Sequence, residues 1–135
     1  MISANDRRYR QLECAKWQPL SIDGQVLEGV EWSTLAGTAS WVCYWMRMAP
    51  GSRSPSHQHT GLELVVVLEG EVQDSDGVCF SEGASLVYDA GSQHWLTSLS
   101  GCVLLVIETG PATLASSIEA VENHLPATAT TRESD

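Results

Sequence analysis

Basic residues are scarce in this chain of 135 residues. It has 7 Lys and Arg residues against 17 Asp and Glu residues, which gives a formal net charge of −10 at pH 7. A surface of this sign repels the phosphates of nucleic acids and the headgroups of anionic membranes. The acidic residues are scattered along the sequence, a distribution typical of a surface that keeps a protein soluble. We therefore expect no nucleic-acid partner and no membrane partner.

Long apolar runs are absent too. No stretch of the sequence approaches the ~20 apolar residues that a helix needs to cross a bilayer. Arg7-Arg8 is typical of a twin-arginine export signal, but Gln11, Glu13 and Lys16 follow where such a signal has its apolar core. The sequence therefore predicts a soluble, cytoplasmic protein.

Closely spaced cysteines are also missing. Cys14, Cys43, Cys79 and Cys102 form no CxxC pair and have no short regular spacing. Neither a thiolate zinc site nor a redox pair is indicated. Two of them, Cys43 and Cys102, fall in apolar, strand-like runs, where we expect them to be buried as small hydrophobic residues.

Histidine is rare, yet three of the four histidines share one pattern with a glutamate. His57 and His59 precede Glu63, and His94 follows a second glycine-punctuated stretch. Imidazole and carboxylate bind divalent first-row metals, and residues two positions apart on an extended chain point to the same side. Surface histidines or a hydrogen-bonded core pair are the alternative. The spacing of all four residues favours a metal site.

Beyond residue 25 the chain is dense in short runs of β-branched and aromatic residues. Glycine-containing turns such as Asp76-Gly77 and Ser100-Gly101 separate several of these runs. Seven or eight short strands in one domain predict an all-β sandwich or barrel. The predicted strands are 26–35, 40–48, 62–68, 78–80, 85–88, 94–99 and 102–108.

The two ends of the chain differ from this central part. Residues 1–24 are polar and are predicted to form an arm that packs on the barrel, which spans residues 25–110. Apolar residues then recur at helical spacing, which predicts one short C-terminal helix over residues 111–126. Residues 127–135 are small and polar without periodicity, which predicts a disordered tail.

Some predicted strands are apolar on both faces. The run Leu64–Leu68 is an example, and a strand of this kind must be covered on both sides. One face fills the barrel, and the other needs cover. We therefore predict a homodimer, with cover by the arm and the helix alone as the alternative.

The first part of the histidine pattern resembles the first motif of the cupin superfamily. The similarity covers residues 51–70 and includes every ligand and glycine position of that motif. The matching residues are Gly51, His57, His59, Glu63 and Gly70.

The stretch from Gly83 to Ser98 is similar to the second cupin motif. Gly83, Gly91 and His94 match, whereas Asp89 and Ser98 stand where the family usually has Pro and Asn. These departures concern turn geometry and the support of the site, not its ligands. The resemblance implies a cupin fold, a double-stranded β-helix or jelly-roll antiparallel barrel. It also implies one divalent ion per chain, bound by His57, His59, Glu63 and His94.

A looser similarity extends toward the N-terminus. Trp17-Gln-Pro19, Leu27-Glu-Gly-Val30 and Ala49-Pro50-Gly51 resemble the cupin branch that includes ChrR-type zinc anti-sigma proteins and small standalone dioxygenases. The resemblance implies either a zinc-binding sensory protein or an enzyme. The sequence leaves no room for a sigma-binding domain before residue 25 and has no His-Cys-Cys cluster, so we expect the enzyme.

The predicted ligand set leaves an ion with open coordination positions, which permit catalysis. Fe(II) or Zn is the expected metal, with Mn, Ni and Cu as alternatives, because ligand type alone does not select among them. We predict a dioxygenase-type oxygenase that acts on a small organic substrate such as a diketone or hydroxy-ketone. Glu63 is the predicted catalytic residue, which tunes the ion and accepts a proton. The alternatives are a ChrR-like zinc-binding regulatory cupin and a non-redox metal-dependent isomerase or cyclase.

Overall fold

The computed structural model describes residues 1–22 and 24–110, apart from the side chains of Ile22 and His57. Two short 3-10 helices, Ala4–Asp6 and Leu12–Cys14, precede the strands. The predicted helix at 111–126 and the predicted tail at 127–135 lie outside the described residues. The strands are β1 (Gln18–Ile22), β2 (Gln25–Thr38), β3 (Trp41–Met48), β4 (Ser52–Arg53), β5 (His57–Gln58), β6 (Glu63–Asp74), β7 (Cys79–Ser81), β8 (Ser85–Tyr88), β9 (Gln93–His94), β10 (Leu96–Ser98) and β11 (Cys102–Thr109).

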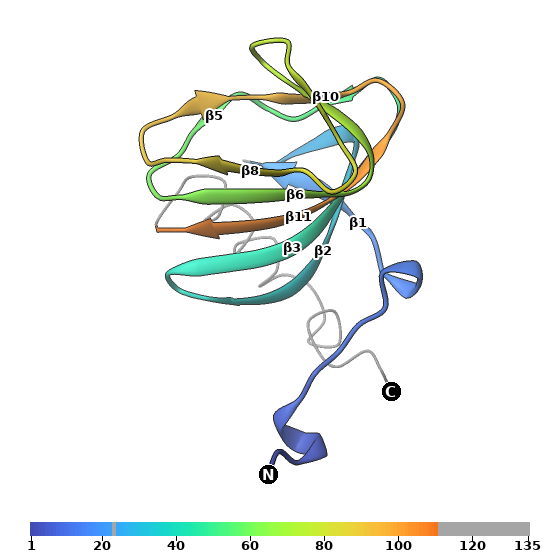
Figure 1. The fold of residues 1–135 in the computed structure, drawn as a ribbon, viewed down its shortest axis with the longest axis vertical. Helices are drawn as coiled ribbons and strands as arrows, with labels where there is room; N and C mark the ends of the chain where they lie inside the picture. The colour runs from blue at the N-terminus through green and yellow to red at the C-terminus, as the bar shows by residue number, and fades with distance from the viewer. Residues whose placement is uncertain (23, 111–135) are drawn as a thin grey trace.

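The strands curl into an antiparallel barrel (Figure 1). In the described part of the chain, the main sheet runs in the order β1-β2-β3-β11-β6-β10-β4, and β7 and β8 also pair with β6. Strands β5 and β9 form a separate two-stranded ribbon. The predicted all-β architecture is thus confirmed. Strand β1 adds an edge strand within the stretch that the sequence assigns to the arm.

Strand β6 lies between two partner strands, and its first residue is one of the predicted ligands, Glu63. Along one edge it pairs with β11, where Glu63 is opposite Glu108, and along the other with β8, where Glu63 is opposite Tyr88. Side chains opposite one another in adjacent strands share a face of the sheet. Glu63, Glu108 and Tyr88 are therefore neighbours on one face, although they are far apart in the sequence.

The barrel interior is filled by the alternate residues of its long strands. In β3 and β11 every second residue is buried, which is the period that a strand with one face inward must have. Cys102 is buried as expected, whereas Cys43 lies on the outer face of β3 and is half-exposed. The buried apolar residues are Leu20, Val30, Trp32, Val42, Tyr44, Met46, Met48, Val65, Val67, Val72, Leu86, Leu96, Cys102, Leu104 and Val106.

Two glycines within residues 51–70 lie so close to other backbone atoms that no side chain fits there. A Cβ atom on Gly61 would lie 1.9 Å from the carbonyl oxygen of Thr109, at the end of β11. A Cβ atom on Gly70 would lie 2.2 Å from the carbonyl oxygen of Gly101, and Gly70 also has a φ of +78°. Gly61 lets the loop before β6 approach the end of β11, and Gly70 lets β6 pass close to Gly101 in a left-handed backbone conformation. The Gly61 contact places the start of β6, which carries Glu63, beside the end of β11.

Substitution of Gly61 by Ala tests this contact. The added methyl group would force the loop before β6 away from Thr109, so we expect the free energy of unfolding to fall by about 1–3 kcal/mol or more. Denaturant unfolding at constant pH measures this loss. Thr60→Ala, a substitution at the exposed neighbouring position, is the matched control. Equal stability of the two variants would show that the loop does not depend on this contact.

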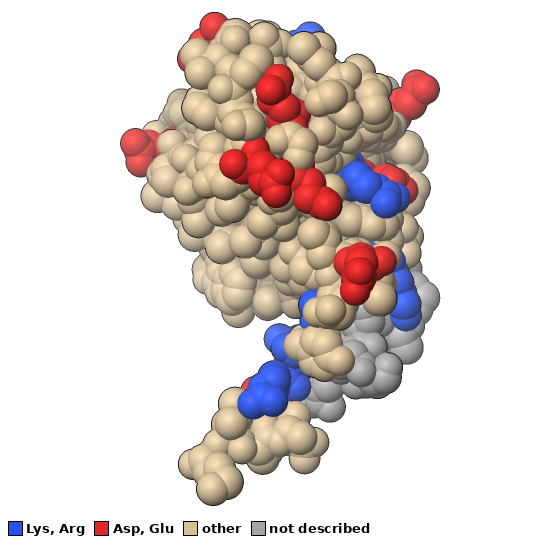
Figure 2. All heavy atoms as spheres, turned by 45° about the vertical axis from the view of Figure 1, so that its right-hand side comes forward, with Lys and Arg blue, Asp and Glu red and all other residues tan. Residues whose placement is uncertain are grey.

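The N-terminal arm extends away from the barrel (Figure 1). Trp17, at its end, packs under the guanidinium group of Arg47 in β3, whose carbon lies 4.5 Å from the indole centroid. Acidic side chains lie on the barrel surface in Figure 2, and several basic ones lie on the arm. None of the helices within residues 1–22 and 24–110 has the length and apolarity of a membrane span.

Candidate metal centre

His59, Glu63 and His94 come from three separate segments. His59 lies in the loop after β5, where its amide donates to the carbonyl of Ser92 and its carbonyl accepts from the amide of Gly91. These two hydrogen bonds hold the loop that follows β5 against the loop that precedes β9. His94 ends β9 and Glu63 begins β6. The paired loops thus bring His59 and His94 to the end of β6 that carries Glu63.

The three side chains meet inside the barrel. His94 Nε2 lies 2.9 Å from His59 Nε2 and 3.2 Å from Glu63 Oε1. His59 Nε2 lies 3.4 Å from the same oxygen. His59, Glu63 and His94 are only 2%, 3% and 5% exposed, so water does not separate them from one another. The structure therefore brings together three of the four predicted ligands as one group that could hold a metal ion.

The spacing of the donor atoms fits a metal ion. Bonds of about 2.0–2.1 Å to one ion, at octahedral or tetrahedral angles, place neighbouring ligand atoms about 2.8–3.4 Å apart. The separations of 2.9, 3.2 and 3.4 Å match this range closely. Two imidazole nitrogens and a carboxylate oxygen are also acceptors when they are deprotonated, so a cation between them satisfies all three. The donor set suits a divalent first-row metal.

The fourth predicted ligand, His57, is described only through its backbone. Its side chain lies outside the described part of the chain. Its Cα pairs with that of His94 across the two-stranded ribbon of β5 and β9. The ligand role of His57 stays a prediction.

A second carboxylate, that of Glu108, is buried beside the three donors. Glu108 is 1% exposed. It accepts a hydrogen bond of 3.1 Å from the hydroxyl of Tyr44, and its Oε1 lies 3.9 Å from His59 Nδ1. The ring of His59 therefore has carboxylates near both of its nitrogens. Sequence reasoning did not identify Glu108 as part of the site.

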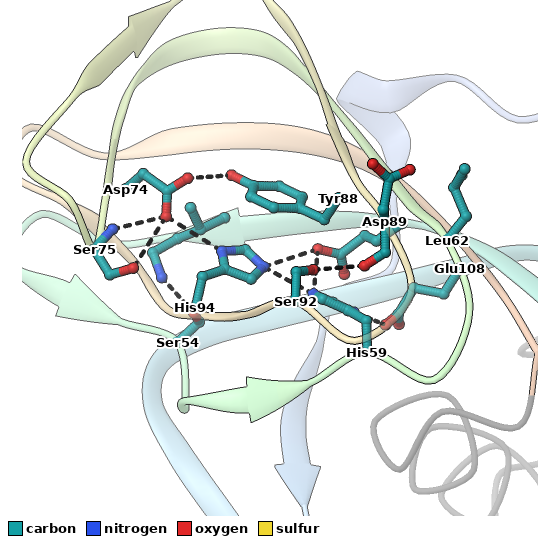
Figure 3. A network of polar contacts seen from close by, with 12 residues as sticks. Ser54, His59, Leu62, Asp74, Ser75, Tyr88, Asp89, Ser92, His94 and Glu108 are labelled. Carbon is teal, nitrogen blue, oxygen red and sulfur yellow. Dashed lines mark hydrogen bonds and ion pairs between the residues drawn. The ribbon is translucent and has the colours of Figure 1, made fainter.

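A third carboxylate, that of Asp74, lies behind His94 (Figure 3). Asp74 Oδ1 is 3.3 Å from His94 Nδ1, and Asp74 Oδ2 accepts a hydrogen bond of 2.6 Å from the hydroxyl of Tyr88. The Tyr88 ring stacks on the His94 ring, with centroids 3.8 Å apart and planes 16° apart. The sequence analysis also missed Asp74 and Tyr88.

Burial alters the protonation of the central carboxyl group. Loss of solvent raises the pKa of Glu63 from 4.5 to about 7, and the charge of Asp74 raises it as well, while a hydrogen bond with Glu108 opposes the shift. Near pH 7 this carboxyl group therefore exists in both protonation states. It binds a metal ion in its ionised form.

The pKa values of His94 and Asp74 shift together because the two groups are in contact. Burial lowers the pKa of His94, although the nearby charge and hydrogen bond of Asp74 oppose the shift. Burial alone would raise the pKa of Asp74, but hydrogen bonds from Tyr88 and from the amide of Ser75, together with His94, outweigh it and lower the value. At neutral pH the pair is therefore a neutral imidazole beside a carboxylate. A neutral imidazole is the form that ligates metals.

The cavity beside these donors is mainly apolar. Among the described residues, apolar side chains make up most of its lining, beside Glu63 and His94. Among the aromatic residues of β3, Tyr44 faces this cavity, whereas Trp41 and Trp45 lie on the outer face of the strand. The lining residues are Leu20, Tyr44, Met46, Ser54, Pro55, Glu63, Val65, His94, Leu96 and Val106.

The family of the chain follows from a comparison with known protein families. Residues 5–113 match the model of the ChrR Cupin-like domain. The chain belongs to the ChrR cupin-like family. This match confirms the resemblance that the histidine motifs indicate, and it extends over most of the N-terminal arm. No curated protein matches the sequence.

Solved structures support the fold of this ChrR-like cupin. The crystal structure of Rhodobacter sphaeroides SigE in complex with the anti-sigma ChrR matches with 26% identity and a TM-score of 0.62, over 73% of this chain and 51% of that chain. This chain therefore spans about half of that relative's length. The polyketide cyclase RemF from Streptomyces resistomycificus matches with 16% identity and a TM-score of 0.68, over 78% and 81% of the two chains.

An acetylacetone dioxygenase from Acinetobacter johnsonii is also similar in structure. It has 16% identity and a TM-score of 0.66, over 78% of this chain and 76% of that chain. Structures of an anti-sigma complex, a polyketide cyclase and a dioxygenase thus share this barrel fold. The cupin fold is confirmed, and the function must be argued from the site.

Proposed function

We propose that this protein is a metal-binding cupin of the regulatory type, in which a buried divalent ion stabilises the barrel. The observation that supports this proposal most directly is the convergence of His59, Glu63 and His94 at metal-ligand spacing inside the barrel. The ion would supply a Lewis-acidic centre with an exchangeable position.

The comparisons favour regulation over turnover of an organic substrate. The chain belongs to the ChrR cupin-like family, and it is 26% identical to a chain of the complex between SigE and the anti-sigma ChrR.

The proposed ligands are His59, Glu63 and His94, with His57 as the fourth. Zn is the metal we expect in a regulatory protein, because it is redox-inert and accepts a closed set of nitrogen and oxygen ligands. A protein that responds to the ion also needs a surface for a protein partner. We propose such a partner, and we retain the homodimer as a proposal because β3, β11 and β6 carry half-exposed apolar residues on their outer faces.

An oxygenase remains the second candidate, because the carboxyl group of Glu63 can transfer protons. With a pKa raised to about 7, Glu63 can accept and release a proton next to the ion near neutral pH. The apolar lining from Leu20, Met46 and Val106 would also suit a small organic molecule. Iron would then be the metal.

Oxygen uptake and ligand binding separate the two candidates. The metal-free protein is loaded anaerobically with Fe(II), and oxygen consumption is recorded with a panel of diketones and hydroxy-ketones. In parallel, the visible spectrum of the Co(II)-loaded protein is titrated with azide. The regulatory proposal predicts no oxygen uptake with any diketone or hydroxy-ketone, and a spectral response to azide, which reports the exchangeable position of the ion. Uptake that depends on a diketone would replace it with the oxygenase.

A further inference from the structure

Asp74 contacts the candidate metal centre from behind His94. It ends strand β6, and its carboxylate reaches the Nδ1 side of the His94 ring at 3.3 Å, while the Nε2 side faces His59 and Glu63. Asp74 is therefore on the side of the imidazole that points away from the other donors. It contacts the ion's ligand without itself being one of the three converging donors.

The position of the Asp74 carboxylate is itself fixed by several contacts. The hydroxyl of Tyr88 donates to Oδ2 at 2.6 Å, and the amide of Ser75 donates to Oδ1 at 2.7 Å. The Tyr88 ring lies parallel to His94 at a centroid distance of 3.8 Å, so one tyrosine both orients the carboxylate and packs against the imidazole (Figure 3). The three side chains form one unit, which we call the Asp74–Tyr88–His94 cluster.

This cluster decides which nitrogen of His94 carries the proton. A neutral imidazole has one N–H donor and one acceptor nitrogen. A carboxylate beside Nδ1 accepts the proton-bearing N–H there, and this leaves the lone pair on Nε2 directed at the other donors. A carboxylate that orients a histidine in this way commonly raises metal affinity. In the absence of Asp74, the proton can move to Nε2 and block the ligand atom.

We propose that Asp74, held by Tyr88, is a positioning residue that fixes the Nδ1–H tautomer and the ring orientation of His94 for metal binding. This inference rests on the proposed metal site. It concerns His94 only, because the corresponding distance from His59 Nδ1 to Glu108, 3.9 Å, is too long for a hydrogen bond.

Asp74 also has a structural role, which the choice of variants must take into account. Its carboxylate accepts from the amide of Ser75, and its backbone takes part in the turn around Gly77. Asp74→Ala therefore risks a loss of folding. Asp74→Asn keeps the size and one acceptor oxygen, and Tyr88→Phe keeps the stacked ring but removes the hydroxyl that holds Asp74. Glu71→Gln, at an exposed position of the same strand, is the matched control for charge.

The experiment measures Zn²⁺ affinity by competition with a chromophoric chelator, on metal-free full-length protein. Long-range ¹⁵N–¹H NMR of the same samples reports which ring nitrogen of His94 is protonated. We expect Asp74→Asn to weaken Zn²⁺ binding by about 10–100-fold and to transfer proton occupancy from Nδ1 to Nε2. Tyr88→Phe should change both quantities in the same direction by a smaller factor. Glu71→Gln should bind as the wild type does.

The outcomes distinguish this inference from the proposal on which it depends. If the wild type takes up no Zn²⁺, the metal site fails and the inference fails with it. If the wild type binds but Asp74→Asn binds within twofold and His94 keeps its Nδ1 proton, the metal site stands and the positioning role is wrong. Weaker binding without a change of tautomer would also contradict the inference, because a purely structural effect would explain it.

Discussion

Replacement of His94 by Ala is expected to lower metal content and thermal stability together. The imidazole supplies one of three converging donors, and the free energy of metal binding is also free energy of folding when the ligands come from separate segments. At a metal concentration 1,000 times the dissociation constant, this linkage is worth about 4 kcal/mol. For a chain of this size the corresponding loss is about 14 °C in melting temperature.

Comparison of metal-free and metal-loaded protein separates the ligand role of His94 from its packing role. His94 also stacks on Tyr88, so the variant loses some stability in either state. We expect most of the loss to appear in the loaded state, as measured by calorimetry with and without chelator. Gln93→Ala, at the exposed neighbouring position, is the control. Full metal occupancy in His94→Ala would rule out the proposed ligand set.

Glu63→Gln is expected to change the stability of the metal-free protein and of the metal-loaded protein in opposite directions. The pKa of Glu63 is about 7 in the folded metal-free protein and 4.5 without burial. Between these pH values the folded state holds a proton that the unfolded state has lost. The stability of the metal-free protein therefore falls as pH rises through this window, by an amount on the order of a few kcal/mol. A glutamine has no proton to lose and removes this dependence.

Bound metal reverses the order of stability of the wild type and the variant, because the ionised carboxylate of Glu63 is then the favoured form. We expect metal-free Glu63→Gln to be more stable than metal-free wild type at pH 8. At pH 4 the difference in stability between the two proteins should be smaller. The loaded wild type should be more stable than the variant at pH 8, and its Zn²⁺ affinity should weaken below about pH 7 as Glu63 gains a proton. Thermal melts across pH, with Glu69→Gln as an exposed control on β6, test both statements. If Glu63→Gln destabilised the metal-free protein at pH 8, burial would not be the cause of the raised pKa.

Much of the fold follows from the sequence, because inward and outward residues alternate. The predicted strand at 85–88 has the observed bounds, and those at 40–48 and 102–108 differ by one residue at an end. Strand β6 runs on to Asp74, well beyond the predicted end at Leu68, because after Gly70 it pairs with β7 and β10 in place of β11. The short strands β4 and β5 were missed because two residues give no periodicity.

The site was only partly predictable, and the reason differs between residues. His59, Glu63 and His94 are ligand types at a recognisable spacing, and the structure brings them together. Glu108 carried a signal that was overlooked, since it is a charged residue at an inward position of an apolar strand. Such a residue requires polar partners.

Asp74 carried no comparable signal. Its sequence context, Asp74-Ser-Asp-Gly77, is typical of an ordinary hairpin turn. Only the curl of β6 brings this residue to His94, and Tyr88 reaches it from the neighbouring strand β8. Contacts of this kind depend on tertiary structure, so the local pattern does not contain them. The same holds for the size of the cavity, which depends on how ten side chains pack.

The central claim is that the barrel binds one ion through the converging donors. Elemental analysis tests it most directly, on protein that has been stripped with chelator, reloaded with Zn²⁺ and freed of excess metal, alongside Glu63→Gln and His94→Ala. The proposal predicts one zinc ion per wild-type chain and a clear loss in both variants. Less than a stoichiometric amount of zinc in well-folded wild type, or equal zinc in all three proteins, would contradict it.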